Sequence, residues 1–336
     1  MLTRLVFLAM ALSAPAFAQQ PEFAGKTINI YVAGTAGGGI DLYARWFAKY
    51  VGKHILGNPA VNVQVMPGAG GIRAAKFLAE TAPKDGTALA TFSGGPLLEP
   101  LVGAQSHGYD ASKFGWVGAI TRDISLCIGW KASPFRTIED VRAREMIVAG
   151  TGAGSDTDTY PLLLNEMLGT KFRVVTGYLG SKETFMAIET GEAHGRCGMT
   201  WSALKAAKPD WIRDGKLSYL IQMGMKKHRD LPEAPLAHDL LTRQEDKQLL
   251  ELLMAGTSIG RNFAAAPGTP ASRVDILRRA FDATMKDPAF IAEGAQMQAE
   301  VEPTNGEETQ AVLARVYATP QPVLERAKKL IAPASN

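Results

Sequence analysis

Residues 28–51 read INIYVAGTAGGGIDLYARWFAKYV, and this stretch decides the fold of the first part of the chain. The β-rich residues 28–32 alternate in hydropathy, a glycine-rich loop follows at 34–39, and apolar residues then repeat every four positions, as on one face of a helix. The same order of strand, glycine loop and helix recurs at residues 61–80, and a third strand at 88–92 ends in Ser93-Gly94-Gly95-Pro96. Strands that alternate with helices predict a mainly parallel sheet with helices on both faces.

A second series of strands and helices begins near Asp123. A glycine-rich loop from Gly150 to Ser155 precedes a predicted helix at 156–168, and Thr137 with Asp140 is typical of a helix N-cap with an acidic third position. A helix with proline at its first position begins at Thr269-Pro270. Further strands are predicted at 124–130, 146–149, 172–175, 194–199, 217–223 and 257–264. We therefore expect two α/β lobes, the first from residues 19–122 and 250–336 and the second from residues 123–249.

The composition excludes several classes of protein. Of 336 residues, 46% are hydrophobic and 21% are charged, so the chain can bury a sizeable core and is not disordered. Lys and Arg number 36 against 33 for Asp and Glu, a balance too even for an electrostatic nucleic-acid binder. The two cysteines exclude a disulfide framework, and no Cys/His spacing of zinc type is present. Neither a metal nor a cofactor is expected.

The first eighteen residues are typical of a signal peptide. Arg4 supplies a positive charge, residues 5–12 form a short apolar segment, and Ala16-Phe17-Ala18 fits the A-x-A cleavage rule. The apolar segment is too short to span a bilayer, and no later segment is long and apolar enough to do so. We expect cleavage after Ala18 and a soluble, periplasmic protein.

Glycine-rich loops at the ends of strands favour a site for an anion. In open α/β sheets, ligands bind at the carboxyl ends of strands, where helix N-termini offer unpaired N–H groups and a partial positive charge. Glycine lets the backbone approach the ligand closely. Several such loops around one cleft would hold a carboxylate or a phosphate. A dinucleotide site is excluded at Gly68-Ala69-Gly70, because the motif needs glycine where the chain has Arg73.

The order and spacing of these loops resemble the Bug family, the periplasmic solute receptors of tripartite tricarboxylate transporters. The resemblance covers essentially the whole mature chain, and the residues that carry it are Ala36-Gly37-Gly38-Gly39-Ile40-Asp41, Met66-Pro67-Gly68-Ala69-Gly70-Gly71, Ala82-Pro83-Lys84-Asp85-Gly86-Thr87, Ala264-Ala265-Ala266-Pro267-Gly268-Thr269-Pro270, Phe281-Asp282-Ala283 and Asp287-Pro288-Ala289-Phe290. It implies a two-lobed periplasmic-binding-protein fold of the Venus-flytrap type, with a mixed, mainly parallel sheet in each lobe. It also implies a small carboxylate as the ligand and the permease subunits of a membrane transporter as partners. A monomer is expected.

The chain departs from the family at three places. The family often has Pro-Phe-Pro where this chain has Ala33-Gly34-Thr35, and Asn where it has Ile72. The strand at 194–199 is usually acidic and apolar, but here it carries Arg196. The identity of the carboxylate therefore does not carry over from the family.

Predicted ligand contacts come from both lobes. The resemblance assigns ligand contact to the first two loops, from Thr35 to Gly39 and from Gly68 to Gly71. In the first lobe the contacts are Thr35, Ala36, Gly37, Gly38, Gly39, Asp41, Gly68, Ala69, Gly70, Gly71, Ser93 and Gly94. In the second lobe they are Thr151, Gly152, Ser155, Tyr178, Arg196 and Thr200.

Several of these residues have a purely structural alternative. The glycine loops are also compatible with tight turns, and Ser155 with a helix N-cap. Tyr178 is equally compatible with an aromatic residue at the rim of the cleft. Asp41 most simply caps the helix that begins beside it, because a carboxylate would repel an anionic ligand, and the alternative is that it binds an amine of the ligand. Asp158 is expected to be solvated.

Arg196 places a full charge on a glycine-flanked strand. In the core it would need a buried ionic partner, because an unpaired buried charge is very costly. On the surface nothing would require it, whereas in the cleft its planar fork would hold a carboxylate through two hydrogen bonds. The sequence favours the cleft, with a structural ion pair as the main alternative.

No pattern in the sequence indicates catalysis. Ser93 lacks the G-x-S-x-G context of a nucleophile, and no histidine is paired by motif with Ser or Cys. We expect a binding protein rather than an exported hydrolase or lyase, and sequence does not separate a transport receptor from the ligand-sensing partner of a membrane kinase. Cys127 and Cys197 lie on separate predicted strands, where export permits a disulfide but buried thiols are favoured.

Overall fold

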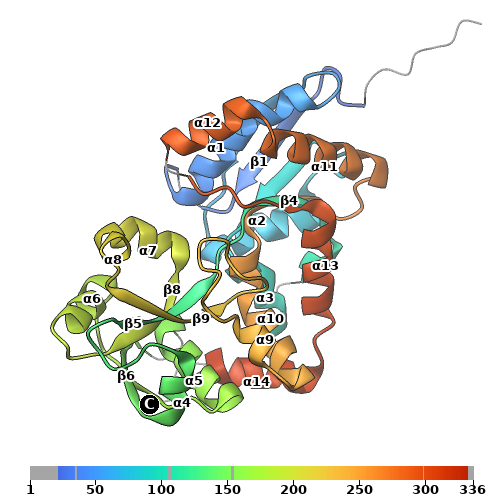
Figure 1. Ribbon diagram of the computed structural model, residues 1–336. Coiled ribbons are helices and arrows are strands. Elements are labelled where there is room, and N and C mark those ends of the chain that lie inside the picture. The colour runs from blue at the N-terminus through green and yellow to red at the C-terminus, as the bar shows by residue number, and fades with distance from the viewer. Residues whose placement is uncertain (1–21, 35, 104–107, 153–154, 298, 332–336) are drawn as a thin grey trace, which may run out of the picture.

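The computed structural model describes residues 22–331 except 35, 104–107, 153–154 and 298. Two lobes are visible in Figure 1, each built around a mixed sheet. The predicted two-lobed α/β fold is confirmed. Among the described residues, no helix has the length and apolar character needed to cross a membrane.

The strands of the first lobe follow the order β11-β4-β10-β3-β1-β2, and those of the second follow β7-β6-β8-β5-β9. Their bounds are β1 (Thr27–Val32), β2 (Ala60–Val65), β3 (Ala88–Thr91), β4 (Gly115–Thr121), β5 (Ser125–Trp130), β6 (Met146–Ala149), β7 (Phe172–Val175), β8 (Gly195–Thr200), β9 (Leu217–Met223), β10 (Gly260–Ala265) and β11 (Thr304–Asn305). The α-helices are α1 (Gly39–Val51), α2 (Ile72–Lys76), α3 (Gly95–Val102), α4 (Ile138–Ala143), α5 (Asp156–Leu168), α6 (Ser181–Glu189), α7 (Trp201–Ala207), α8 (Pro209–Arg213), α9 (Ala237–Leu240), α10 (Gln244–Ser258), α11 (Ala271–Met285), α12 (Pro288–Gln296), α13 (Gly306–Tyr317) and α14 (Gln321–Ile331).

Strand pairing brings the predicted loops of the first lobe to one edge of its sheet. β1 pairs in parallel with both β2 and β3, so the loops after these three strands share an edge. β10 lies antiparallel between β3 and β4, which makes β4 end at Thr121 on the same edge. The sequence missed β4 and started the last strand at Thr257, which belongs instead to the end of α10.

The second sheet presents the same kind of edge to the first lobe. The chain enters this lobe at Ser125, which pairs with Thr200 at the carboxyl end of the antiparallel neighbour β8. β6 runs parallel to β7 and β8, so the carboxyl ends of all three strands lie near the crossing. The two edges with predicted ligand loops therefore flank the crossing at residues 122–124.

Aromatic packing stabilises the first lobe, and ionic contacts attach the C-terminal helix to the second lobe. Trp46 of α1 stacks on Phe290 of α12 with ring centroids 3.8 Å apart. Arg326 of α14 reaches Asp246 of α10 at 2.7 Å and Glu166 of α5 at 2.6 Å, so the last helix contacts the second lobe. Residue 250, the predicted boundary between the lobes, lies inside α10.

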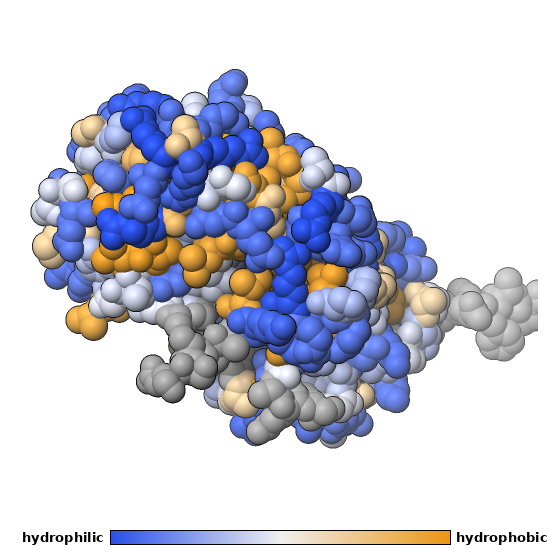
Figure 2. Space-filling view, turned by 90° about the horizontal axis from the view of Figure 1, so that it is seen from below, coloured by the Kyte–Doolittle hydropathy of each residue, from blue (hydrophilic) through white to orange (hydrophobic). Residues whose placement is uncertain are grey.

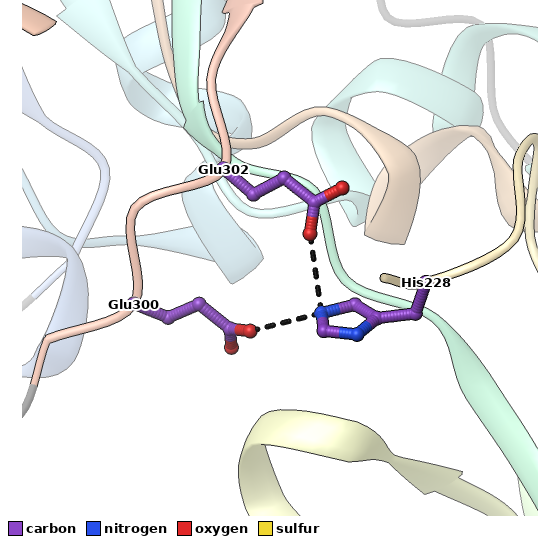
Figure 3. A group of neighbouring side chains, drawn as sticks. All are labelled: His228, Glu300 and Glu302. Atoms are coloured by element: carbon purple, nitrogen blue, oxygen red, sulfur yellow. Dashed lines mark hydrogen bonds and ion pairs between the residues drawn. The ribbon is translucent and has the colours of Figure 1, made fainter. Parts of the chain in front are cut away.

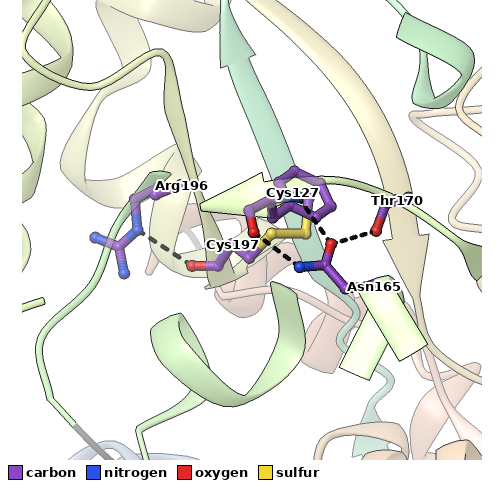
Figure 4. Close-up of a disulfide and its surroundings, with 6 residues drawn as sticks. Cys127, Asn165, Thr170, Arg196 and Cys197 are labelled. Atoms are coloured by element: carbon purple, nitrogen blue, oxygen red, sulfur yellow. Dashed lines mark hydrogen bonds between the residues drawn. A yellow bond between two sulfur atoms is a disulfide. The ribbon is translucent and has the colours of Figure 1, made fainter. Parts of the chain in front are cut away.

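Cys127 of β5 and Cys197 of β8 form a disulfide, so the expectation of buried thiols was wrong (Figure 4). The two strands are antiparallel neighbours, and a shift in their register between Leu126 and Ile128 sets the cysteines beside each other. Strand order is not legible in the sequence, and so the pairing could not be predicted. The disulfide joins two strands at the centre of the second sheet.

The surface is mixed in polarity. Figure 2, which views the molecule from the underside of Figure 1, shows apolar residues in groups between hydrophilic ones. Large exposed apolar side chains include Leu162 and Leu179 of the second lobe.

Candidate functional site

The three glycine-rich loops of the first lobe meet at Gly71. This buried glycine has φ of +100°, and a Cβ placed on it would lie 2.9 Å from Cγ of Pro96 and 3.1 Å from Cβ of Ala33. The loops after β1, β2 and β3 therefore pack against one another around a position that only glycine fits. One edge of the first sheet therefore holds most of the ligand contacts predicted for this lobe: Ala36 to Gly39, Gly68 to Gly71, and Ser93 with Gly94. Thr35 lies outside the described residues.

Asp41 closes the first loop instead of capping the helix. Gly38 is the N-cap of α1, and no side chain caps it. The buried carboxylate of Asp41 accepts hydrogen bonds from the N–H of Gly37 at 2.7 Å and from Nε of Arg45 at 3.0 Å. The capping prediction was wrong because Asp41 is the third helical residue, from which the side chain reaches back past the N-cap to the loop.

The second-lobe loop after β6 is held by a buried carboxylate. Asp158, which was expected to be solvated, is buried and accepts hydrogen bonds from the N–H of Gly152 and the hydroxyl of Ser155, each at 3.2 Å. The hydroxyl of Thr151 bonds to that of Thr157 at 2.9 Å. These bonds order the predicted contacts Thr151, Gly152 and Ser155 at the N-terminus of α5 before any ligand arrives.

Thr200 and Tyr178 complete this edge with side chains that already have partners. The hydroxyl of Thr200 caps α7 by accepting the N–H of Ala203 at 3.3 Å. The phenol of Tyr178 donates to Glu192 at 2.7 Å, and partial burial together with this bond raises the pKa of Tyr178 to about 12. Tyr178 is therefore protonated at neutral pH.

Arg196 is buried, and its Nε points to the carbonyl of Cys197 at 3.5 Å (Figure 4). Its side chain lies against α6, where Nη1 donates to the hydroxyl of Thr184 at 2.7 Å and contacts that of Ser181 at 3.4 Å. Within the described part of the chain no carboxylate pairs with the guanidinium, so the ion-pair alternative was wrong, as was exposure to solvent. Burial lowers the pKa of Arg196 to about 10. A guanidinium beside the N-terminal turn of α6 favours an anion at this place.

A cavity of about 770 Å³ opens between the lobes next to these edges. It is lined by Tyr43, Thr121, Asp123, Ser202, Lys205, Ala206, Pro209, Arg229, Gly256, Thr257, Gly260, Arg261, Ala299, Glu300 and Val301. None of the predicted contacts lines it, but Gly39 lies against Arg261, and the hydroxyl of Thr200 bonds to that of Ser202 at 3.3 Å. The lining comes from segments far apart in the sequence, and no local motif marks them.

His228, Glu300 and Glu302 form a cluster beside this cavity (Figure 3). Nε2 of His228 lies 3.1 Å from an oxygen of each carboxylate, a spacing that resembles metal ligation. Nδ1 of the same ring accepts the backbone N–H of Asp230 at 3.1 Å, so the neutral ring carries its proton on Nε2. A protonated nitrogen cannot bind a metal, and the geometry therefore favours a hydrogen-bonded link between the lobes over a metal site.

Comparisons with known proteins agree on the fold. No protein-family model matches the sequence. A UPF0065 protein of Bordetella bronchiseptica is 25% identical over 311 residues, which cover 90% of this chain and 86% of the relative. A TctC solute-binding protein from Polaromonas, solved without ligand, has a TM-score of 0.70 at 20% identity. The match covers 91% of this chain and 98% of the Polaromonas chain.

Two further solved structures are similar to this chain in fold. The periplasmic binding protein BugD has a TM-score of 0.51 at 22% identity, over 93% of this chain and 99% of its own. A Rhodopseudomonas palustris protein with adipate has a TM-score of 0.54 at 20% identity, over 91% of this chain and 97% of its own. The predicted resemblance to the Bug receptors is thus confirmed at the level of the fold, and TctC and BugD are binding proteins rather than enzymes.

Proposed function

We propose that the chain is a periplasmic solute-binding protein that captures a small carboxylate between its lobes and delivers it to a membrane transporter of the tripartite tricarboxylate type. The observation that carries this proposal is that two edges of glycine-rich loops face the crossing between the lobes, and that β8 of the second lobe carries the buried Arg196, which pairs with no carboxylate of the described residues. The adipate-bound relative in fold supports a carboxylate as the ligand. Residues 1–18, as a signal peptide, would direct export.

The chemistry of the two edges suits binding without turnover. The backbone N–H groups of the first loop, apart from that of Gly37, which donates to Asp41, and those of the loop after β2 are donors that bind anions but perform no acid–base chemistry. Across the crossing, the guanidinium of Arg196 on β8 supplies a positive charge. A carboxylate held by both edges would favour the closed arrangement of the lobes, since a ligand shifts a conformational equilibrium by its differential affinity.

A screen of the mature protein against mono-, di- and tricarboxylates, amino acids and aromatic acids tests this proposal. A ligand at about 100 times its dissociation constant adds about 2.7 kcal/mol to the free energy of unfolding. We expect at least one small carboxylate to raise the melting temperature by several degrees, and mass spectrometry to recover it unchanged. Chemical conversion of the bound acid, or no shift with any acid, would contradict the proposal.

A further inference from the structure

The segment between α12 and β11 carries two glutamates that are fixed to the first lobe. The N–H of Glu302 donates to the carbonyl of Ile120 in β4 at 3.0 Å. The phenol of Tyr43 on α1 accepts the N–H of Glu300 at 2.9 Å and donates to its carbonyl at 3.2 Å. The main chain of this segment therefore moves with the first lobe, while both carboxylates point to His228 (Figure 3).

His228 is fixed just as firmly to the second lobe. The fully buried side chain of Gln222 in β9 accepts the N–H of His228 at 2.8 Å and donates to the carbonyls of Leu231 at 2.7 Å and Ala234 at 2.9 Å. Leu231 and Ala234 belong to the apolar core of the second lobe. The contact between His228 and the two glutamates therefore has its halves in different lobes.

This contact lacks one hydrogen bond when the ring is neutral. Nδ1 of His228 accepts the N–H of Asp230, so the single ring proton is on Nε2, which lies 3.1 Å from Oε1 of Glu300 and 3.1 Å from Oε2 of Glu302. One N–H does not satisfy both oxygens, and Oε2 of Glu302 is buried without a hydrogen-bond partner among the described residues. Two carboxylates at one nitrogen repel each other unless a proton or a cation lies between them.

The charges around the ring favour one more proton. Oδ2 of Asp230 lies 3.8 Å from Nδ1 of His228 and is a third carboxylate beside the ring. Two cations face these three acids: Lys205, which pairs with Glu300 at 3.0 Å and Asp230 at 3.6 Å, and Arg229, which lies 3.7 Å from Asp230. A second ring proton would balance the three negative charges with three positive ones.

The other charged groups near the contact do not supply this proton. Burial opposes the ionisation of Glu300, but hydrogen bonds from His228 and Lys205 hold the pKa of Glu300 below its usual range, so it stays a carboxylate. Carboxylates, lysine and arginine ordinarily keep their charge near neutral pH, whereas imidazole changes its charge between about pH 5 and 8. The further charged groups around the contact and the adjoining cavity are Arg122, Asp123, Lys226, Arg261 and Glu308.

We propose that His228, Glu300 and Glu302 form a proton-controlled link between the lobes. With the additional proton, both carboxylates are held and the link is strong. When the proton is lost as the pH rises, the two carboxylates repel each other and the link weakens. Groups this close titrate together, so the proton belongs to the cluster of three residues. Since each half is fixed to its own lobe, the change acts on the relative position of the lobes. The inference goes beyond the proposed function and does not depend on the solute that is bound.

Small-angle X-ray scattering of the ligand-free protein in EDTA, from about pH 5.5 to about pH 8.5, tests the inference across the range in which imidazole titrates. We expect the radius of gyration of the wild type to increase with pH in one sigmoidal step. His228→Gln keeps a donor but does not titrate, so it should show the larger radius at every pH. Glu302→Gln removes one of the two repelling charges, so it should show the smaller radius at every pH.

The control is His54→Gln. Nε2 of His54 lies 3.0 Å from Asp287, and both residues belong to the first lobe, so this variant should keep the wild-type response to pH. Circular dichroism at each pH identifies the variants that are folded. A wild type with a constant radius of gyration overturns the inference, as does a folded His228→Gln or Glu302→Gln variant that keeps the wild-type step. Each of these results leaves the proposed function standing.

Discussion

Arg196 illustrates how one residue can be unfavourable for folding and favourable for binding. Arg196 is only 4% exposed, and the hydrogen-bond partners of its guanidinium are neutral hydroxyl and carbonyl groups. Removing a guanidinium from water without an anion is costly. The hydroxyl of Thr184 also donates to the carbonyl of Ser181 at 2.9 Å, so it would keep a partner if the arginine were replaced.

Replacing Arg196 by methionine should therefore separate stability from binding. Without ligand, Arg196→Met should raise the free energy of unfolding by about 1–3 kcal/mol, because apolar groups of similar volume are better tolerated there than a charge. Affinity for the carboxylate found in the screen should fall about ten- to a hundredfold, and Arg196→Lys should recover part of it. Denaturant unfolding and calorimetry measure the two effects. A destabilised variant with wild-type affinity would make Arg196 a structural residue.

At the scale of elements, the loop after β1 is expected to bind the carboxylate through its backbone N–H groups. Gly37 has φ of +75°, and its N–H donates to Asp41, so its conformation sets the direction of the donors around it. Gly169, at the end of α5, has a similar φ of +66°. At both positions a Cβ would have no neighbour within 4 Å, so alanine changes only the backbone preference.

Gly37→Ala and Gly169→Ala form a matched pair. Each should lower the free energy of unfolding by about 1–2 kcal/mol, because alanine disfavours the left-handed conformation. Only Gly37→Ala should also weaken carboxylate binding, by up to about tenfold, since one donor would lose its direction. Thermal unfolding and calorimetry on both variants distinguish these effects. Equal, wild-type affinity in the two variants would mean that the loop after β1 is only a turn.

Local sequence patterns predicted the strands, helices and loops of this site. The order of the strands and the burial of individual side chains depend on tertiary pairing and could not be predicted. Hydropathy period and glycine clusters are legible within a few residues, and so the loops after β1, β2 and β6 were found. The insertion of β10 between β3 and β4 is not local, and it is what carries Arg261 to Tyr43. Asp158 was misjudged for a related reason, since its burial depends on how the loop folds back over α5.

At the scale of the whole molecule, ionic contacts link the lobes beside the cavity. His228 and Lys205 of the second lobe meet Glu300, which precedes β11 of the first. Lys226 also pairs with Glu308 of α13. Lys205 and Glu300 of these contacts also line the cavity between the lobes. Capture between the lobes requires one ligand to touch both of them.

Hydrogen–deuterium exchange, with and without a saturating acid identified by the screen, measures this requirement directly. We expect slower amide exchange in both edges, at residues 36–41 and 68–71 of the first lobe and at residues 155–158 of the second, because a shared ligand covers them together. Protection confined to one lobe, or found only at sites away from both edges, would contradict capture of the carboxylate between the lobes.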